Sequence, residues 1–239
     1  MPLEIPILPF AEISKFEASP ATIFKHSQFV MMIAKMDLLQ DVFCNYKKWD
    51  NEELNEIGNC RIEKRRREKL TGKLCVKTLF EKNWNMRVNI HADSHAPEIY
   101  SDGSRLENFF CSISHSNNWV CGIVSDNRVG IDIEKQRYFK PNLCQFFCSK
   151  QEIEYLDFLD GEDKQLASLQ FFCSKEAILK TLGLGIAGGP QKANMQDLKI
   201  AHWNGATYED QIFEVFFIRP KQFGLAICLD RTSKSQINS

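Results

Sequence analysis

The sequence predicts an α+β protein built from two similar halves, each an antiparallel sheet packed with one long helix. Its 239 residues suit one large domain or two small ones. A hydrophobic content of 44% is enough for a sizeable core, and a charged content of 26% argues against disordered and collagen-like chains. The same order of elements occurs twice along the chain, and this repetition is the main reason for predicting two halves.

The repeated order is a long helix followed by a β-hairpin. Apolar periodicity predicts helices over residues 61–82 and 163–182. Polar turns between β-branched and aromatic runs predict hairpins over residues 109–124 and 212–229. A helix packed on such a hairpin is an α+β arrangement.

A short identity accompanies this layout. Lys77-Thr78-Leu79, near the end of the first helix, recurs 103 residues later as Lys180-Thr181-Leu182. Three residues can agree by chance, so the shared layout carries the prediction. We place the first half at residues 1–124 and the second at residues 125–239.

Charge and cysteine content narrow the classes of function. Thirty basic and 31 acidic residues give a formal net charge of −1, which argues against a globally basic nucleic-acid binder. The nine cysteines form no CxxC pair, so zinc-ribbon and thioredoxin-like motifs are excluded. We expect buried, reduced thiols in a cytoplasmic protein.

No apolar run is long enough to cross a membrane. The best one, Phe29 to Ala34, is stopped by Lys35. The first residues also lack the basic segment, apolar stretch and small-residue cleavage site of a signal peptide. We therefore expect a soluble, cytoplasmic monomer with neither a membrane nor a nucleic-acid partner.

Two acidic residues lie on one face of an alternating strand. Over residues 128–134, apolar side chains alternate with Gly130, Asp132 and Glu134. The two carboxylates are thus about 7 Å apart on one face. They repel each other unless a cation lies between them, and Mg²⁺ binds one or two carboxylates while keeping waters and phosphate oxygens. Taken alone, this motif is more often a solvated strand face.

The helix predicted over residues 163–182 carries an apolar stripe that becomes charged. The stripe ends in Glu176 and Lys180, an i, i+4 pair in the favourable order. A surface ion pair is the ordinary explanation. The functional alternative is a third carboxylate and a cation beside Asp132 and Glu134, able to bind metal, take a proton or offset phosphate charge.

Four segments of the chain carry a resemblance to a known family. They are CSISHS at 111–116, VGIDIEK at 129–135, FFCSKQE at 146–152 and FCSKEAILK at 172–180. In this order they resemble the SHS, GIDIE, FFxxxE and WxxKExxxK signature of the 4′-phosphopantetheinyl transferase superfamily, Sfp type. One such motif is a weak signal, whereas four in order are a strong one.

The resemblance implies a fold of two pseudo-twofold-related α+β halves and a specific reaction. The implied reaction transfers 4′-phosphopantetheine from coenzyme A to a serine of an apo acyl or peptidyl carrier protein and releases 3′,5′-ADP. The implied partners are coenzyme A and the carrier protein. The implied cofactor is Mg²⁺, bound to the pyrophosphate.

The resemblance also assigns site residues. The acidic positions of the family's metal site match Asp132, Glu134 and Glu176. Its coenzyme A phosphate contact matches His115, with Ser114 beside it. Its basic helix positions match Lys175 and Lys180, and Lys175 is a further candidate to bind coenzyme A.

The catalytic roles follow from what the matched residues can do. Phosphoryl transfer depends mostly on positioning and on neutralising charge. The attacking serine must lose a proton, and Glu176, or Glu152 through a water, is the candidate base. A protonated Lys180 is the candidate to assist the departing phosphate. The sequence does not choose between the two bases.

The chain departs from the family pattern upstream of the first motif. Where the family usually has Gly-Lys-Pro, this chain has residues 95–97, a His-Ala-Pro with no lysine. The candidates to replace the lysine are His95, Arg105 and the basic run 61–69, with Arg67 preferred, although an ungapped alignment places Glu68 there. The basic run is otherwise a solvated helix face.

Two other classes of function stay open. A degenerate module that binds coenzyme A or a carrier protein without turnover is consistent with the missing lysine. A magnesium-dependent phosphohydrolase is consistent with three carboxylates and a lysine. The GxGxxG match at residues 183–188 follows a helix, so it is not a dinucleotide fingerprint. His91 and His95 are expected in a loop rather than in a metal site.

Overall fold

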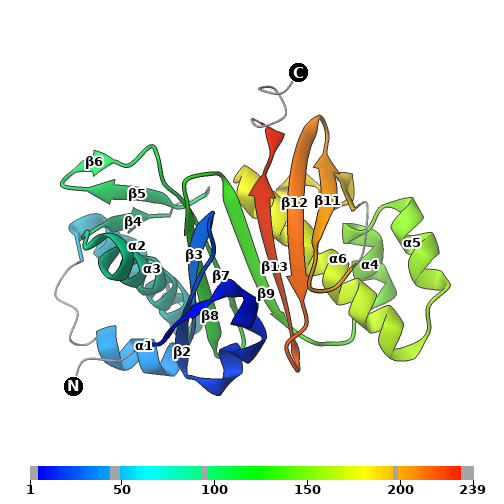
Figure 1. Cartoon of the computed structure of the whole chain (residues 1–239), viewed down its shortest axis with the longest axis horizontal. Helices are drawn as coiled ribbons and strands as arrows, with labels where there is room; N and C mark the ends of the chain where they lie inside the picture. Colours follow the sequence, from blue (N-terminus) through cyan, green and yellow to red (C-terminus); the bar gives the residue numbers. More distant parts are fainter. Residues whose placement is uncertain (1–4, 44–48, 93–95, 196–198, 233–239) are drawn as a thin grey trace. The chain divides into compact units, whose positions relative to one another are not determined.

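The computed structural model describes residues 5–43, 49–92, 96–195 and 199–232. Contacts between Cα atoms divide the chain into two compact units, Met1–Asn127 (unit 1) and Arg128–Ser239 (unit 2). A boundary after Val124 would fall inside strand β8 (Trp119–Ser125), one residue before the strand ends. Each unit combines a largely antiparallel sheet with helices, which confirms the predicted α+β class (Figure 1).

Unit 1 contains a five-stranded sheet of order β1-β2-β3-β8-β7. All neighbours are antiparallel except β1 and β2, which are parallel. The long helix α3 packs against β3, β7 and β8, and a small sheet β4-β5-β6 lies beside α2 and α3. The elements are β1 (Ile7–Pro9), η1 (Phe10–Ala18), β2 (Ala21–Lys25), β3 (Phe29–Lys35), α1 (Met36–Phe43), α2 (Asn51–Gly58), α3 (Glu63–Trp84), β4 (Asn89–His91), β5 (Glu98–Ser101), β6 (Ser104–Arg105), β7 (Phe110–Ser116) and β8.

Unit 2 contains a five-stranded antiparallel sheet of order β10-β11-β12-β13-β9. The long helix α6 packs against β9, β12 and β13, and α4 and α5 pack against α6. The elements are β9 (Val129–Lys135), α4 (Pro141–Phe147), α5 (Lys150–Asp157), α6 (Gly161–Leu182), η2 (Ile186–Gly188), η3 (Pro190–Lys192), β10 (Ala193–Met195), β11 (Trp203–Tyr208), β12 (Gln211–Ile218) and β13 (Phe223–Asp230).

The two units repeat one order of elements. In each, a seven-residue strand leads through short helices to a 22-residue helix and then to a hairpin whose second strand pairs with the first. The long helices begin and end 98 residues apart, at Glu63 and Gly161 and at Trp84 and Leu182. The offset of 103 residues inferred from the triplet is therefore wrong, and the counterpart of Lys77 is Lys175, not Lys180.

Strand β9 and helix α6 approach each other closely at Gly130. A Cβ atom built on Gly130 would lie 2.0 Å from the backbone oxygen of Ala177 and 2.5 Å from Oγ1 of Thr181. Only a glycine leaves room for the helix backbone here. Because side chains alternate along a strand, the face of β9 that meets α6 at Gly130 also carries Asp132 and Glu134.

The described residues agree with two further sequence expectations. The eight described cysteines are free thiols, and all except Cys60 are buried; Cys44 lies outside the described residues. Within the described part of the chain, no helix is both long enough and apolar enough to span a bilayer.

Candidate active site

Strand β9 and helix α6 bring together the acidic residues and the lysine that the sequence singled out. Nζ of Lys180 donates to Oδ1 of Asp132 at 2.8 Å and to the backbone oxygen of Ile131 at 3.1 Å. Asp132 is only 4% exposed. Lys180 thus reaches across from the helix to the strand, a contact that its i, i+4 spacing from Glu176 did not reveal.

Glu176 lies among the other charges of this cluster. Burial, followed by the carboxylates of Asp132 and Glu134, raises its pKa to about 7, while Lys180 acts in the opposite direction. The causes of this shift show that three carboxylates and one lysine lie close enough to interact. We call Asp132, Glu134, Glu176 and Lys180 the acidic cluster.

Cys173 contacts Asp132 of the acidic cluster, and the sequence analysis did not predict this contact. The thiol is fully buried. Burial raises its pKa well above the ordinary value, and the nearby carboxylates of Asp132 and Glu134 and a hydrogen bond to Asp132 raise it further. A thiol in such surroundings stays protonated and donates to the carboxylate. The sequence feature that could have predicted this contact is the position of Cys173 on the same helical stripe, three residues before Glu176.

The acidic cluster offers carboxylate oxygens, the type of ligand atom that Mg²⁺ binds. Carboxylate oxygens are the ligands this ion prefers, and it needs only one or two of them because waters and phosphates complete its shell. Burial is the main cause of the raised pKa of Glu176, and the carboxylates of Asp132 and Glu134 contribute to it. Among the described residues, however, no three His, Cys, Asp or Glu side chains are arranged to surround one metal ion.

Glu152 and Lys175 form a separate contact between α5 and α6. Nζ of Lys175 donates to Oε2 of Glu152 at 2.5 Å, and both residues are buried. Glu152 also completes a capping box at the start of α5, where its Oε2 accepts from the backbone N–H of Ser149 at 2.7 Å. Burial lowers the pKa of Lys175, and the charge of Glu152 counteracts this effect.

His115 and Ser114 lie on β7 in unit 1. The side chain of His115 is 32% exposed, and its Nε2 lies 3.5 Å from Oε2 of the buried Glu68. Ser114 is buried, and its backbone oxygen accepts from the thiol of Cys121 at 3.5 Å. Of these two predicted coenzyme A contacts, His115 presents the more accessible side chain.

The candidate cations of unit 1 already have acidic or amide partners. Arg67 donates to Asp37 and to Asn118, and Asn118 donates to Asp37 at 2.6 Å, so the turn between β7 and β8 is tied to α1 and α3. Arg105 lies 2.8 Å from Glu98. His95 lies outside the described residues.

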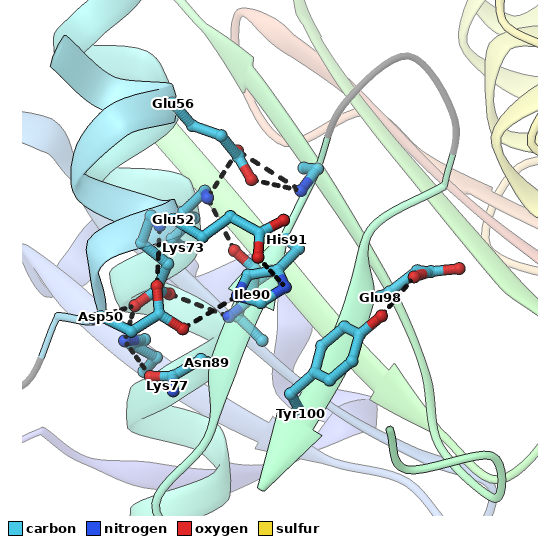
Figure 2. Close-up of polar contacts among 12 residues, drawn as sticks. Asp50, Glu52, Glu56, Lys73, Lys77, Asn89, Ile90, His91, Glu98 and Tyr100 are labelled. Atoms are coloured by element: carbon cyan, nitrogen blue, oxygen red, sulfur yellow. Dashed lines mark hydrogen bonds and ion pairs between the residues drawn. The ribbon is translucent and has the colours of Figure 1, made fainter. Parts of the chain in front are cut away.

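A buried polar network in unit 1 was not anticipated from the sequence (Figure 2). Lys73 donates to Glu56 at 2.7 Å and to the backbone oxygen of Ile90 at 2.6 Å. His91, expected in a loop, lies in β4, where its ring meets Asp50 at 2.9 Å. The network ties α2, α3 and β4 together. The available signal was the capping-box spacing of an aspartate and a glutamate at the start of α2.

Unit 2 also contains a cavity of about 520 Å³ between α4, α5 and the first half of α6. Its walls include Phe139, Ile153 and Leu156, with Lys164 and Asp157 among its polar residues. No residue of the acidic cluster lines it. The cavity is therefore distinct from the cluster.

The sequence model of the 4′-phosphopantetheinyl transferase superfamily matches residues 128–228, which form most of unit 2. Residues 128–228 are therefore similar to this superfamily, which confirms the resemblance inferred from the motifs. The matched part contains the acidic cluster as well as Glu152 and Lys175.

Individual relatives carry the same name. A putative 4′-phosphopantetheinyl transferase of Synechocystis sp. is 34% identical over 98 residues, which are 39% of this chain and 38% of that protein. The 4′-phosphopantetheinyl transferase psf-1 of Bacillus pumilus is 33% identical over 85 residues, 36% of each chain. The chain thus matches little more than a third of the length of these relatives.

A solved structure also resembles part of the chain. A holo-(acyl-carrier-protein) synthase of Bacillus anthracis, in complex with CoA (3′,5′-ADP), has a TM-score of 0.38 and 18% sequence identity, covering 43% of this chain and 93% of that chain.

Proposed function

We propose that this protein transfers 4′-phosphopantetheine from coenzyme A to a serine of an apo carrier protein and releases 3′,5′-ADP. The observation that carries the proposal is the acidic cluster, held by β9 and α6 within the matched part of the chain. The relative from Bacillus pumilus, named a 4′-phosphopantetheinyl transferase, supports the proposal.

In the proposed reaction, the serine oxygen attacks the phosphorus that carries pantetheine, and the bond from that phosphorus to the ADP phosphate oxygen breaks. Glu176 takes the proton of the serine. In the metal-free site, burial and the neighbouring carboxylates make Glu176 more basic than an ordinary glutamate. Glu152, in contrast, is buried in a capping box and an ion pair, which favours Glu176 as the base.

Asp132, Glu134 and Glu176 are the residues from which we propose that one or two carboxylates would hold Mg²⁺. When bound, Mg²⁺ would neutralise pyrophosphate charge and polarise the reacting phosphorus. Asp132 also holds Lys180 in place, so that the ammonium group can offset negative charge on the departing phosphate.

In unit 1, the partly exposed His115 is the residue we propose to contact a phosphate of coenzyme A. Ser114 is proposed to support this contact from within the strand. Arg67 remains a candidate only if it shares the bonds it now makes to Asp37 and Asn118. The cytoplasmic location and the monomeric state expected from the sequence stay predictions.

The test is mass spectrometry of an apo acyl carrier protein and an apo peptidyl carrier domain incubated with coenzyme A, Mg²⁺ and the protein. A mass gain of one phosphopantetheine is expected with Mg²⁺ and not with EDTA. Asp132→Ala should abolish the gain, whereas Asp210→Ala, at an exposed turn, should not. No gain on either carrier would favour a binding module, and loss of coenzyme A without a carrier would favour a phosphohydrolase.

A further inference from the structure

The buried ion pair of unit 2 has a counterpart in unit 1. Lys77 of α3 donates to Oε2 of Glu53 at 2.5 Å, the same distance as between Lys175 and Glu152. Glu53 and Glu152 are each the third residue of a helix that begins with a capping box. The carboxylates and the ammonium groups of both pairs are almost completely buried.

The positions of the two pairs correspond along the repeat. Lys77 and Lys175 are separated by the same 98 residues as the ends of their helices, and α2 and α5 begin 99 residues apart. The strands β3 and β9 begin 100 residues apart. The two ion pairs are thus equivalent parts of the two units.

The acidic cluster, in contrast, exists in only one unit. By the same correspondence, Asp132 and Glu134 of β9 replace Met32 and Ala34 of β3, and Glu176 replaces Thr78. Unit 1 therefore keeps the buried ion pair without the carboxylates proposed for catalysis. The ion pair occurs in both units and is therefore assigned to the fold. The acidic cluster occurs only in unit 2 and is therefore assigned to the reaction.

The ion pair of unit 2 contains Lys175, which directly precedes the proposed base Glu176 in the sequence. Neighbouring residues of an α-helix point about 100° apart. When Lys175 is directed at Glu152 on α5, the next residue, Glu176, is turned toward β9, where Asp132 and Glu134 raise its pKa. A buried ion pair allows little rotation, because any movement leaves a charge unpaired in an apolar interior.

We infer that Glu152 and Lys175 are a positioning pair that fixes the rotation of α6 and so aims Glu176 at the acidic cluster. They do not contact coenzyme A and do not act on protons. This inference rests on the proposed function, and it replaces the catalytic role expected for Glu152 and the coenzyme A contact expected for Lys175. Glu53 and Lys77 form the equivalent ion pair in unit 1, where Thr78 occupies the position of the proposed base.

The test compares two double variants, Glu152→Gln/Lys175→Met and Glu53→Gln/Lys77→Met. Each removes both buried charges together and keeps the side-chain lengths, so each should fold, whereas Lys175→Met alone leaves Glu152 charged and should melt well below the wild type. For the unit 2 double variant, kcat should fall by about 10²-fold with an unchanged KM for coenzyme A, the expected effect of a misplaced catalytic group. The unit 1 double variant should keep both constants.

Three kinetic outcomes would overturn the inference. A unit 2 double variant with wild-type kcat would show that the pair positions nothing. A raised KM for coenzyme A with an unchanged kcat would make Lys175 a ligand contact. An equal loss of kcat in both double variants would point to general loosening of the fold.

Hydrogen exchange provides a readout that does not depend on turnover. Amides of residues 172–180 should exchange faster in the unit 2 double variant than in the unit 1 double variant. If the wild type transfers no phosphopantetheine, the proposed function fails, but this exchange difference still tests the ion pair. Equal exchange over residues 172–180 in the two variants would reject the pair as the feature that fixes α6.

Discussion

Glu176 combines burial with the repulsion of two neighbouring carboxylates, and both raise its pKa from 4.5 to about 7. Between these values, the folded protein holds a proton that the unfolded chain has released. The free energy of unfolding must therefore decrease as the pH rises through this range. A site that destabilises the free protein at neutral pH is consistent with one that binds a cation.

We predict that, in metal-free buffer, the wild type loses on the order of 2–3 kcal/mol of stability relative to Glu176→Gln as the pH rises from about 4.5 to about 7. Urea unfolding of both proteins at several pH values measures the difference. Titrating groups that do not interact with Glu176 behave alike in both proteins and cancel, so the difference reports on Glu176 together with the residues it interacts with. A constant difference across this range would contradict the raised pKa.

His115 is placed to bind rather than to react. It lies near the end of β7, partly exposed, with the buried carboxylate of Glu68 on one side of its ring. An imidazole N–H at such a position can donate a hydrogen bond to a phosphate oxygen. Nothing in the proposed reaction requires this ring to exchange a proton.

We predict that His115→Ala raises the KM for coenzyme A about tenfold, the loss of roughly one charge-assisted hydrogen bond, while kcat changes less. Steady-state kinetics with coenzyme A as the varied substrate measures both constants. The melting temperature serves as the control. An unchanged KM together with a lowered melting temperature would make His115 a residue of the turn and not of the site.

The contact between β9 and α6 determines the geometry of unit 2. Gly130 allows the strand to contact the helix backbone. As a result, Asp132, on the same face of the strand, lies within hydrogen-bond distance of Lys180. The helix is also fixed from its other side by α5 through Glu152 and Lys175. The acidic cluster therefore depends on two packing contacts of one helix.

We predict that Gly130→Ala destabilises the protein by at least ~2 kcal/mol, because the new methyl group would overlap the backbone of α6 and cannot be accommodated by a side-chain rotation. Chemical denaturation measures the loss. Gly58→Ala, at the end of α2 with no atom within 4 Å of the new methyl group, is the matched control and should be neutral or slightly stabilising. A neutral Gly130→Ala would show that the close approach is absent in solution.

At the scale of the whole molecule, each unit has its own hydrophobic core. Leu79 of α3 and Leu179 of α6 are both fully buried, but they belong to different clusters, one within unit 1 and the other within unit 2. A substitution that destabilises one core is therefore expected to increase local unfolding in its own unit more than in the other.

We predict that Leu79→Ala and Leu179→Ala each cost about 2–5 kcal/mol of stability. Hydrogen exchange should accelerate first within the unit that carries the change, which mass spectrometry of peptides from residues 1–127 and 128–239 can resolve. If either variant accelerated exchange equally in both units, the chain would open as one cooperative body and the division into two units would not describe its stability.

Local patterns were sufficient for much of this protein. The periodicities of strand and helix predicted the long helices, both hairpins and the common face of Asp132 and Glu134, since a period of two or 3.6 residues can be read along the chain. The ordered motifs likewise indicated the superfamily whose sequence model matches residues 128–228. The run from Phe29 to Ala34 was recognised only as too short for a membrane and proved to be the core of β3.

What the sequence could not determine were the partners of charged side chains. Lys180 pairs with Asp132, Lys175 with Glu152 and Lys77 with Glu53, and each partner lies on another element, 23 to 48 residues away along the chain. The repeat was also placed five residues out of register, because the identity of a triplet is a weaker guide than the equivalence of two packed helices. Such pairings depend on which faces of distant elements meet when the chain packs, and only the tertiary structure contains that information.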